Sequence, residues 1–175
     1  MSAVARVLQF SAAWMLIGLV TGWVAVRVPR RWLATDTPLT RIRRFEARGR
    51  CYERRLRIER WKHRLPEAGA LFAGGRSKRS TGGRRSEALQ TFAEETRRAE
   101  WVHWAQIAAA PTFGLWNEWV VTVVMVAFAT VVHLPFIVVQ RYNRARVLPI
   151  LVRRGAAPAP GEDAPIPATE LATTS

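Results

Sequence analysis

The sequence predicts an all-α fold, in a small integral membrane protein with three membrane segments and cytosolic amphipathic helices. Residues 7–26 and 119–139 carry no charged side chain, and each has about the twenty apolar residues that a helix needs to cross a bilayer. The chain has a net charge of +14, and most of its 27 basic residues lie between Arg27 and Arg98. Such an excess beside apolar segments is typical of the cytoplasmic side of a membrane.

Residues 1–28 are expected to form the first transmembrane helix. The uncharged stretch is longer than the roughly 7–15 residues of a signal-peptide core, and only Arg6 precedes it. Arg27, Arg30 and Arg31 follow it as a stop-transfer signal. We therefore expect a retained span with the amino terminus outside the cell.

Residues 29–100 are predicted to form a basic cytosolic helical region. Thr37 can cap a helix whose first turn holds Pro38, and Gly49 is expected to bend or split it. Apolar side chains then recur at roughly helical spacing among many arginines, at Leu39, Ile42, Phe45, Tyr52, Leu56 and Ile58. A basic helix with such a stripe either lies on the membrane surface or packs on neighbouring helices, and the stripe alone leaves both open.

A loop rich in Gly, Ser, Arg and Lys is predicted within this region, over about residues 66–86. It contains Lys78 but lacks the Gly-Lys-Ser/Thr ending of a P-loop. A basic loop of this kind either cradles phosphates or is an ordinary solvated loop. Ser86 is expected to cap the helix that follows.

Residues 101–140 are predicted to form a transmembrane helical hairpin. Its first arm, residues 101–116, is short and is made irregular by Pro111 and Gly114, so it either spans the membrane or re-enters it. Basic residues flank both ends of the hairpin, at Arg98 and Arg141, which favours a true span with both ends in the cytosol.

After the hairpin, residues 141–154 are expected to form a basic interfacial segment, and residues 155–175 a disordered tail of Pro, Ala, Thr and acidic residues. The predicted localisation is the cell membrane, as a multi-pass protein with a cytoplasmic carboxyl terminus.

Glu100 and His103 are the candidate catalytic pair. They are three residues apart, so they share one face of a helix where charged sequence gives way to apolar sequence. An imidazole can act as a general base while a carboxylate orients it. The alternative is a histidine that stays hydrated among lipid headgroups, but an ionisable side chain at a membrane segment favours function.

Other chemistries are disfavoured. No metal site is expected, because His63, His103, His133 and Cys51 do not supply a recognisable ligand pattern. No organic cofactor is expected either. Nucleic-acid binding is not expected, because the basic residues bracket apolar segments and are explained by topology and anionic lipids.

Two long motifs resemble a known family. They are Glu95-Thr-x-Arg-Ala-Glu-x-x-His-Trp104 and Pro135-x-Ile-Val-Val-Gln-Arg-Tyr-Asn-Arg-x-Arg146, with Phe45-Glu46-x-x-Gly49 and Trp61-Lys62 upstream. Together they are similar to the glycosyl-4,4'-diaponeurosporenoate acyltransferases. The resemblance implies a membrane acyltransferase that esterifies a sugar hydroxyl of a glycosylated C30 carotenoid acid with a fatty acyl group, late in the synthesis of a staphyloxanthin-type pigment.

On this reading His103 is the base and Glu100 its orienting acid. Arg98 or Arg141 stabilises the oxyanion. Binding of the substrate or of the acyl donor, an acyl-CoA or acyl-carrier protein, is assigned to those two arginines together with Asn143, Arg144, Lys62 and Lys78.

The expected partners are membrane lipids, the glycosyl carotenoid and the fatty acyl donor, and a homo-oligomer is left open. Two alternatives also stay open: an acyltransferase acting on another glycolipid, and a non-catalytic membrane scaffold or lipid-binding protein. The basic flanks bring both arms of the hairpin back to the cytosolic face, with one long motif on each arm, so we expect residues Arg141 to Arg146 to meet Glu100 and His103 there.

Overall fold

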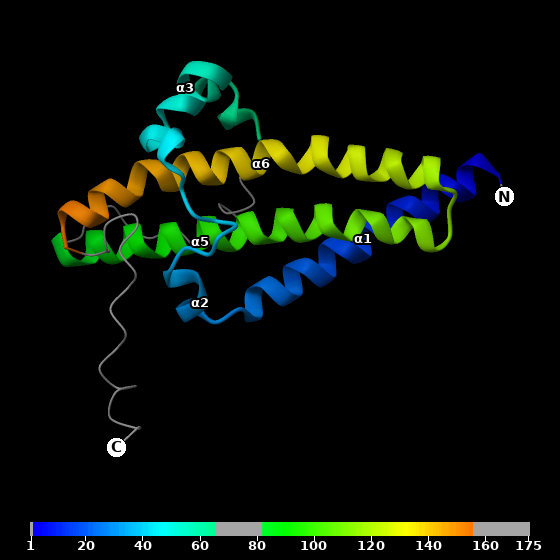
Figure 1. Ribbon diagram of the computed structural model, residues 1–175. Coiled ribbons are helices and arrows are strands. Elements are labelled where there is room, and N and C mark those ends of the chain that lie inside the picture. Colours follow the sequence, from blue (N-terminus) through cyan, green and yellow to red (C-terminus); the bar gives the residue numbers. More distant parts are fainter. Residues whose placement is uncertain (1, 66–81, 156–175) are drawn as a thin grey trace.

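The computed structural model describes residues 2–65 and 82–155, which contain helices and turns and no strand (Figure 1). Lys78 and nearly all of the predicted loop and tail lie outside these residues. The α-helices are α1 (Ala3–Arg27), α2 (Arg30–Ala34), α3 (Arg50–Leu56), α5 (Gly82–Ala109) and α6 (Trp119–Arg153). The 3₁₀ helices are η1 (Arg44–Gly49), η2 (Ile58–Arg60), η3 (Lys62–Arg64) and η4 (Ala110–Leu115).

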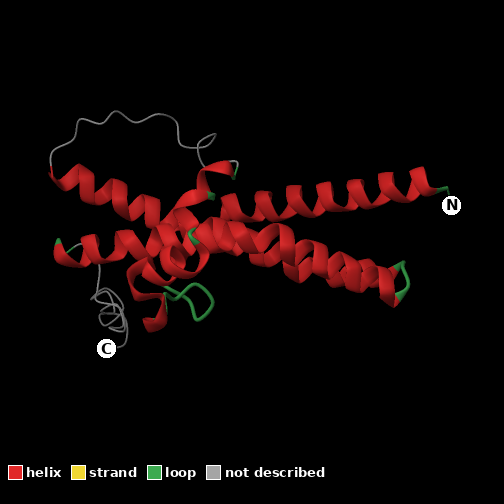
Figure 2. Ribbon diagram, turned by 90° about the horizontal axis from the view of Figure 1, so that it is seen from above, coloured by secondary structure: helices red, strands yellow, loops and turns green. Residues whose placement is uncertain are grey.

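A helical hairpin is present at the predicted position and is formed by α5, η4 and α6. The two long helices lie side by side over nearly their whole length in both ribbon views (Figure 2). The irregularity expected at Pro111 and Gly114 is the 3₁₀ turn η4. Two boundaries differ from expectation: α5 begins at Gly82, before Ser86, and α6 continues through the basic segment to Arg153.

Helix α1 crosses α5 obliquely and diverges from it towards α2 (Figure 1). Near the tip of the hairpin, the Trp14 ring packs on Phe113 with ring centroids 5.1 Å apart. Farther along, the Thr21 hydroxyl accepts a hydrogen bond of 3.4 Å from the Gln106 amide. The first apolar helix is therefore packed against the hairpin.

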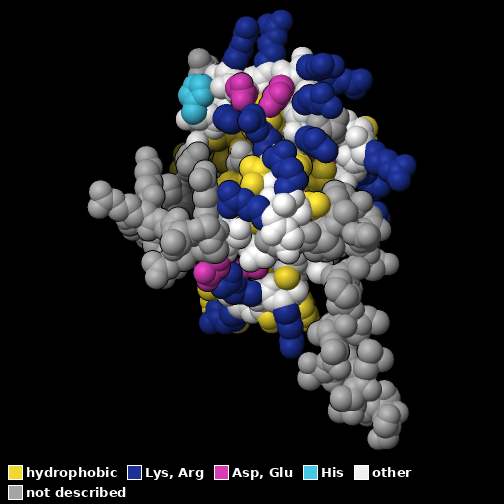
Figure 3. Space-filling view, turned by 90° about the vertical axis from the view of Figure 1, so that its left-hand side faces the viewer, with side chains coloured by type: hydrophobic (Ala, Val, Ile, Leu, Met, Phe, Trp, Pro, Cys, Tyr) yellow, Lys and Arg dark blue, Asp and Glu magenta, His cyan; other side chains and the backbone are white. Residues whose placement is uncertain are grey.

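Helices α1 and α6 are both long and apolar enough to cross a membrane. Large apolar side chains on them point outward; Leu19 is 65% exposed and Val131 is 73% exposed. A helix that is apolar all round is typical of contact with lipid. These two helices indicate membrane association, while basic side chains gather at the end of the molecule where α5 begins and α6 finishes (Figure 3).

The amphipathic helix expected after Thr37 is not continuous. Residues 38–40 form a turn, residues 41–43 are irregular, and helical structure resumes only with η1 and α3. The split expected at Gly49 is confirmed, because this residue has φ +89° and separates the two helices. The segment folds back over α6 instead of lying as one extended helix (Figure 1).

Gly49→Ala is expected to destabilise the protein. A side chain at this left-handed position costs about 1–2 kcal/mol, and the added Cβ would lie 3.1 Å from Tyr142 Cδ2. The thermal midpoint in detergent micelles, followed by circular dichroism, should fall by about 2–4 °C for each kcal/mol. Gly22→Ala is the control, because nothing lies within 4 Å of its added Cβ, and its midpoint should not fall. A midpoint for Gly49→Ala equal to that of the unmodified protein would contradict the strain argument.

Candidate active site

The Glu100 carboxylate is fully buried between α5 and α6. Arg141 donates to its Oε1 at 2.7 Å, and Arg144 donates to its Oε2 at 2.5 Å. The Trp104 indole N–H lies 3.4 Å from Oε1. The contact expected between the two motifs is therefore present, and it is made by ion pairs across the hairpin.

Arg141 joins this carboxylate to a second buried acid. Its other terminal nitrogen donates to Glu46 Oε1 of η1 at 2.5 Å. Glu46 also accepts hydrogen bonds from the Tyr52 hydroxyl at 2.6 Å and from the Arg43 backbone N–H at 2.7 Å. Burial, together with the hydrogen bond to Glu46, raises the pKa of the Tyr52 phenol, so the phenol stays a donor.

The backbone before η1 completes the arginine contacts. Arg141 donates to the carbonyl oxygens of Leu39 at 3.0 Å and Arg41 at 2.8 Å. Arg144 donates to the carbonyl of Thr40 at 2.5 Å. Because residues 38–43 are not helical, these carbonyls are available to side chains.

Acidic and basic side chains alternate through the whole arrangement, which we call the ion-pair chain. At its far end Arg97 donates to Asp36 at 2.6 Å and to the carbonyl of Leu33. Asp36 also lies 3.8 Å from Nε of Arg144. In order, the members of this ion-pair chain are Glu46, Arg141, Glu100, Arg144, Asp36 and Arg97. Its three carboxylates balance its three guanidinium groups, as buried charges require.

His103 does not bond to Glu100; among the described residues its Nδ1 meets Nδ1 of His133 on α6, 3.1 Å away. Its ring stacks on Phe136 with centroids 4.9 Å apart. The expectation that Glu100 orients this imidazole was therefore wrong in geometry. Sharing a helix face allowed the pairing, but the two arginines take up both carboxylate oxygens.

Tyr142 and the residues around it occupy the opposite side of α6. The Tyr142 hydroxyl lies 3.0 Å from carboxylate oxygens of both Glu53 and Glu59, and Arg146 donates to it at 2.8 Å. The Lys62 ammonium lies 4.8 Å from the centroid of the tyrosine ring. Lys62 therefore packs on an aromatic face away from His103.

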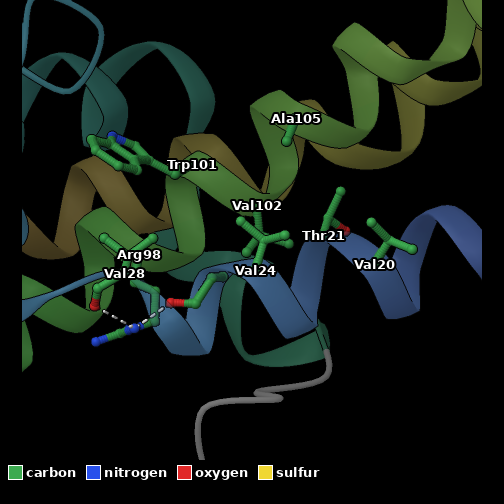
Figure 4. Close-up of a pocket in the computed structure, with 9 residues that line it drawn as sticks. Val20, Thr21, Val24, Val28, Arg98, Trp101, Val102 and Ala105 are labelled. Atoms are coloured by element: carbon green, nitrogen blue, oxygen red, sulfur yellow. Dashed lines mark hydrogen bonds between the residues drawn. The ribbon is translucent and has the colours of Figure 1, made fainter.

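Arg98 lies on the other face of α5, at the end of an apolar groove against α1. Its guanidinium donates to the carbonyl oxygens of Ala25 and Val28 (Figure 4). It also donates to the carboxylate of Glu95. The groove has a volume of about 200 Å³ and is lined by Val20, Thr21, Val24, Ala25, Val28, Arg98, Trp101, Val102 and Ala105. Arg98 is therefore separated from His103 by the helix itself.

Asn143 is half-buried on α6, and its amide makes no hydrogen bond with the described residues. Of the residues assigned to the site from sequence, Glu100, Arg141 and Arg144 are brought together. His103 lies about one helical turn from Glu100, whereas Arg98 and Lys62 point elsewhere.

Sequence reasoning overlooked two residues that complete this region, Glu46 and His133. Glu46 belongs to the Phe45-Glu46-x-x-Gly49 motif, which marked it without giving it a role. His133 is the one ionisable side chain in the uncharged stretch at 119–139, and a titratable group there is itself a signal of function. The described residues contain no group of three or more side chains suited to hold a metal ion.

Apolar helices joined by a buried ion-pair chain, with an imidazole pair beside it, define a helical membrane-associated protein with a polar site between the two arms of a hairpin. The sequence pattern of the glycosyl-4,4'-diaponeurosporenoate acyltransferases matches residues 29–153. The chain belongs to this family and is an acyltransferase.

Relatives from Staphylococcus aureus carry the same description. The protein of strain bovine RF122 / ET3-1 is 27% identical over 148 residues, which cover 83% of this chain and 89% of the relative. The protein of strain N315 is 26% identical with the same coverage. No solved structure matches the chain.

Glu100→Gln is expected to destabilise the fold, because it leaves Arg141 and Arg144 short of a buried counter-charge. Removing one partner of a buried ion pair costs about 3–5 kcal/mol. Denaturant titration of the purified protein in micelles measures the loss. Glu94→Gln is the matched control, since its partner Arg30 is exposed and such pairs contribute about 0–1 kcal/mol. An equal loss of unfolding free energy in the two variants would show that Glu100 stabilises the fold no more than an exposed ion pair does.

Proposed function

We propose that the protein transfers a fatty acyl group to a sugar hydroxyl of a glycosylated C30 carotenoid acid, giving a staphyloxanthin-like pigment. Family membership supports the reaction class, and the names of the relatives support the acceptor. The observation that carries the proposal is the His103–His133 pair, which sets an oriented imidazole next to the ion-pair chain.

In the proposed reaction His103 is the general base and His133 holds its ring. When His103 donates its Nδ1 hydrogen to Nδ1 of His133, its Nε2 carries the lone pair. Nε2 takes the proton of the sugar hydroxyl as the hydroxyl oxygen attacks the acyl carbonyl. The new ester C–O bond forms, the thioester C–S bond of an acyl-CoA or acyl-carrier protein breaks, and the proton passes to the leaving thiolate.

The proposal gives the ion-pair chain a supporting role. Arg141 and Arg144 are committed to carboxylates and backbone carbonyls, so they fix the register of α5 against α6 and thereby the position of His103. Arg98 and Lys62, with Lys78 of the basic loop, supply positive charge for the phosphates of the donor. Tetrahedral-intermediate stabilisation is then left to donors other than the two buried arginines.

We further propose a multi-pass arrangement with three membrane segments, an outside amino terminus and a cytoplasmic carboxyl terminus. Residues 101–115, the apolar end of α5 with η4, run beside the apolar part of α6 and form the short middle segment. The basic end shared by α5 and α6 then faces the cytosol, in line with the positive-inside rule. This places the polar site at the cytosolic interface, where a sugar stays in water and the lipid tails stay in the bilayer.

Mass spectrometry of lipids and pigments tests the reaction. Cells that make the glycosyl carotenoid and express this protein should accumulate its acylated ester, and cells without the protein should not. If a different glycolipid is acylated, the proposed acceptor is wrong but the reaction class stands. The absence of any new ester would favour a non-catalytic lipid-binding role.

His103→Ala should lower acyl transfer by about 10²–10⁴-fold while leaving membrane insertion intact, because it removes the base. Product formed by purified membranes with equal amounts of protein is the readout. His63→Ala is the control, since His63 is exposed on η3 and lies apart from the pair. Normal product formation by His103→Ala would sink the mechanism.

His133→Phe should lower kcat more than His133→Asn does. The asparagine carbonyl can still accept from His103 Nδ1, whereas phenylalanine leaves that N–H without its partner. Both variants should keep the KM for the acyl donor, because neither residue touches the donor in the proposal. Identical kcat values for the two variants would show that the hydrogen bond between His103 and residue 133 has no part in the mechanism.

A further inference from the structure

We propose that Gln140 and Asn143 form the subsite that holds the sugar of the acceptor, next to His103. This inference rests on the proposed function for the acceptor being a glycolipid. The ligand class is a neutral sugar headgroup with several free hydroxyls, carried on a long apolar chain.

The two amides are the half-buried polar side chains of this stretch that make no hydrogen bond with the described residues, whereas the unpartnered Nε and Nη1 of Arg144 are fully buried. Arg141, Tyr142 and Arg144, which lie between and beside them, all make hydrogen bonds or ion pairs. Gln140 and Asn143 are half-buried and make none with the described residues. Each amide offers two donors and an acceptor, and because both are half-buried and still reachable from outside, these groups are open to the hydroxyls of a ligand.

Their placement puts them on the helix stripe that His103 contacts through Phe136. Phe136, Gln140 and Asn143 are spaced i, i+4 and i+7, so they follow one stripe of α6. His103 stacks on Phe136 at one end of this stripe. The helical rise puts Gln140 about 6 Å and Asn143 about 10 Å along the axis from Phe136. A sugar ring that bonds to both amides therefore brings a hydroxyl within reach of His103.

The charges around Gln140 and Asn143 favour a neutral ligand over an anionic one. The charges of Arg141 and Arg144 are balanced by carboxylates, and the two Arg144 nitrogens without a partner, Nε and Nη1, are fully buried and so not open to a phosphate. The groups left over are neutral and can both donate and accept, which matches hydroxyls better than anions. Large apolar side chains are exposed along the deeper part of the same helix, including Val131 and Val132, and provide a surface for the acceptor's tail.

Binding of an alkyl glucoside tests the subsite without requiring turnover. The full-length protein in lipid nanodiscs is photo-crosslinked with a photoreactive long-chain alkyl glucoside, and unlabelled glucoside or the alkyl alcohol of equal chain length competes. The glucoside should compete and the alcohol should not. Gln140→Ala and Asn143→Ala should each weaken glucoside competition by about tenfold, the effect of one lost hydrogen bond to a buried site.

Two further variants keep the test independent of folding defects. Asn143→Asp preserves size and an acceptor but loses the donors, so its competition should fall between that of Asn143→Ala and that of the unmodified protein. Gln9→Ala is the control, because Gln9 is an exposed amide on α1 that makes no hydrogen bond with the described residues. Its competition should not change.

Acyl-transfer kinetics separate this inference from the proposed function. In the alanine variants the KM for the glycosyl acceptor should rise about tenfold, while the KM for the acyl donor stays constant. Normal acceptor KM in active variants, or equal competition by glucoside and alcohol, would overturn the subsite and leave the reaction standing. Amide-dependent glucoside binding without any acyl transfer would uphold the subsite and overturn the proposed reaction.

Discussion

The structure depends on the burial of the Glu100 carboxylate between two guanidinium groups. In lipid, apolar side chains do not drive helices together, because the surrounding acyl chains are equally apolar. Close packing, as between Trp14 and Phe113, and polar contacts then specify which helices associate and in what register. Arg141 and Arg144 do so for α5 and α6, and Arg141 extends the same network to Glu46 of η1. A single set of ion pairs thus fixes the hairpin and the segment folded over it.

Such a network is expensive to desolvate, so it is stable only when every charge has a partner. The alternation from Glu46 to Arg97 meets this condition, with three charges of each sign. Side chains that hold each other this tightly cannot also reorganise around a reacting ester. The chemistry is therefore better placed on the neighbouring groups that the network leaves alone, the His103–His133 pair and the amides of α6.

Much of this architecture follows from the sequence. The length of the two uncharged stretches predicted the two apolar helices. The basic residues at both ends of residues 101–140 predicted a hairpin whose arms return to the same membrane face. That geometry was enough to predict that the run from Arg141 to Arg146 meets Glu100, but not that Arg141 and Arg144 are the residues that do so. The pairing of Glu100 with His103 could not be decided in the same way. Helical spacing says which side chains can meet, but not that two guanidinium groups from another helix compete more strongly for the carboxylate.

The incorrectly predicted helix after Thr37 has its reason in the same network. A helix there would have used the carbonyl oxygens of residues 39–41 in its own i to i+4 hydrogen bonds. In the structure Arg141 and Arg144 donate to all three of these carbonyls. A guanidinium has five N–H donors in a fixed fork, and in this geometry the carboxylates of Glu46 and Glu100 accept only some of those of Arg141 and Arg144. The spacing of apolar residues after Thr37 favoured a helix. The arginines of α6, however, need backbone carbonyl oxygens that are not used in a helix, and the turn and irregular residues at 38–43 supply them. The irregular segment thus supplies carbonyl acceptors to the buried ion pairs. The residues that keep it from forming a helix are the arginines of α6, about a hundred residues further along the sequence.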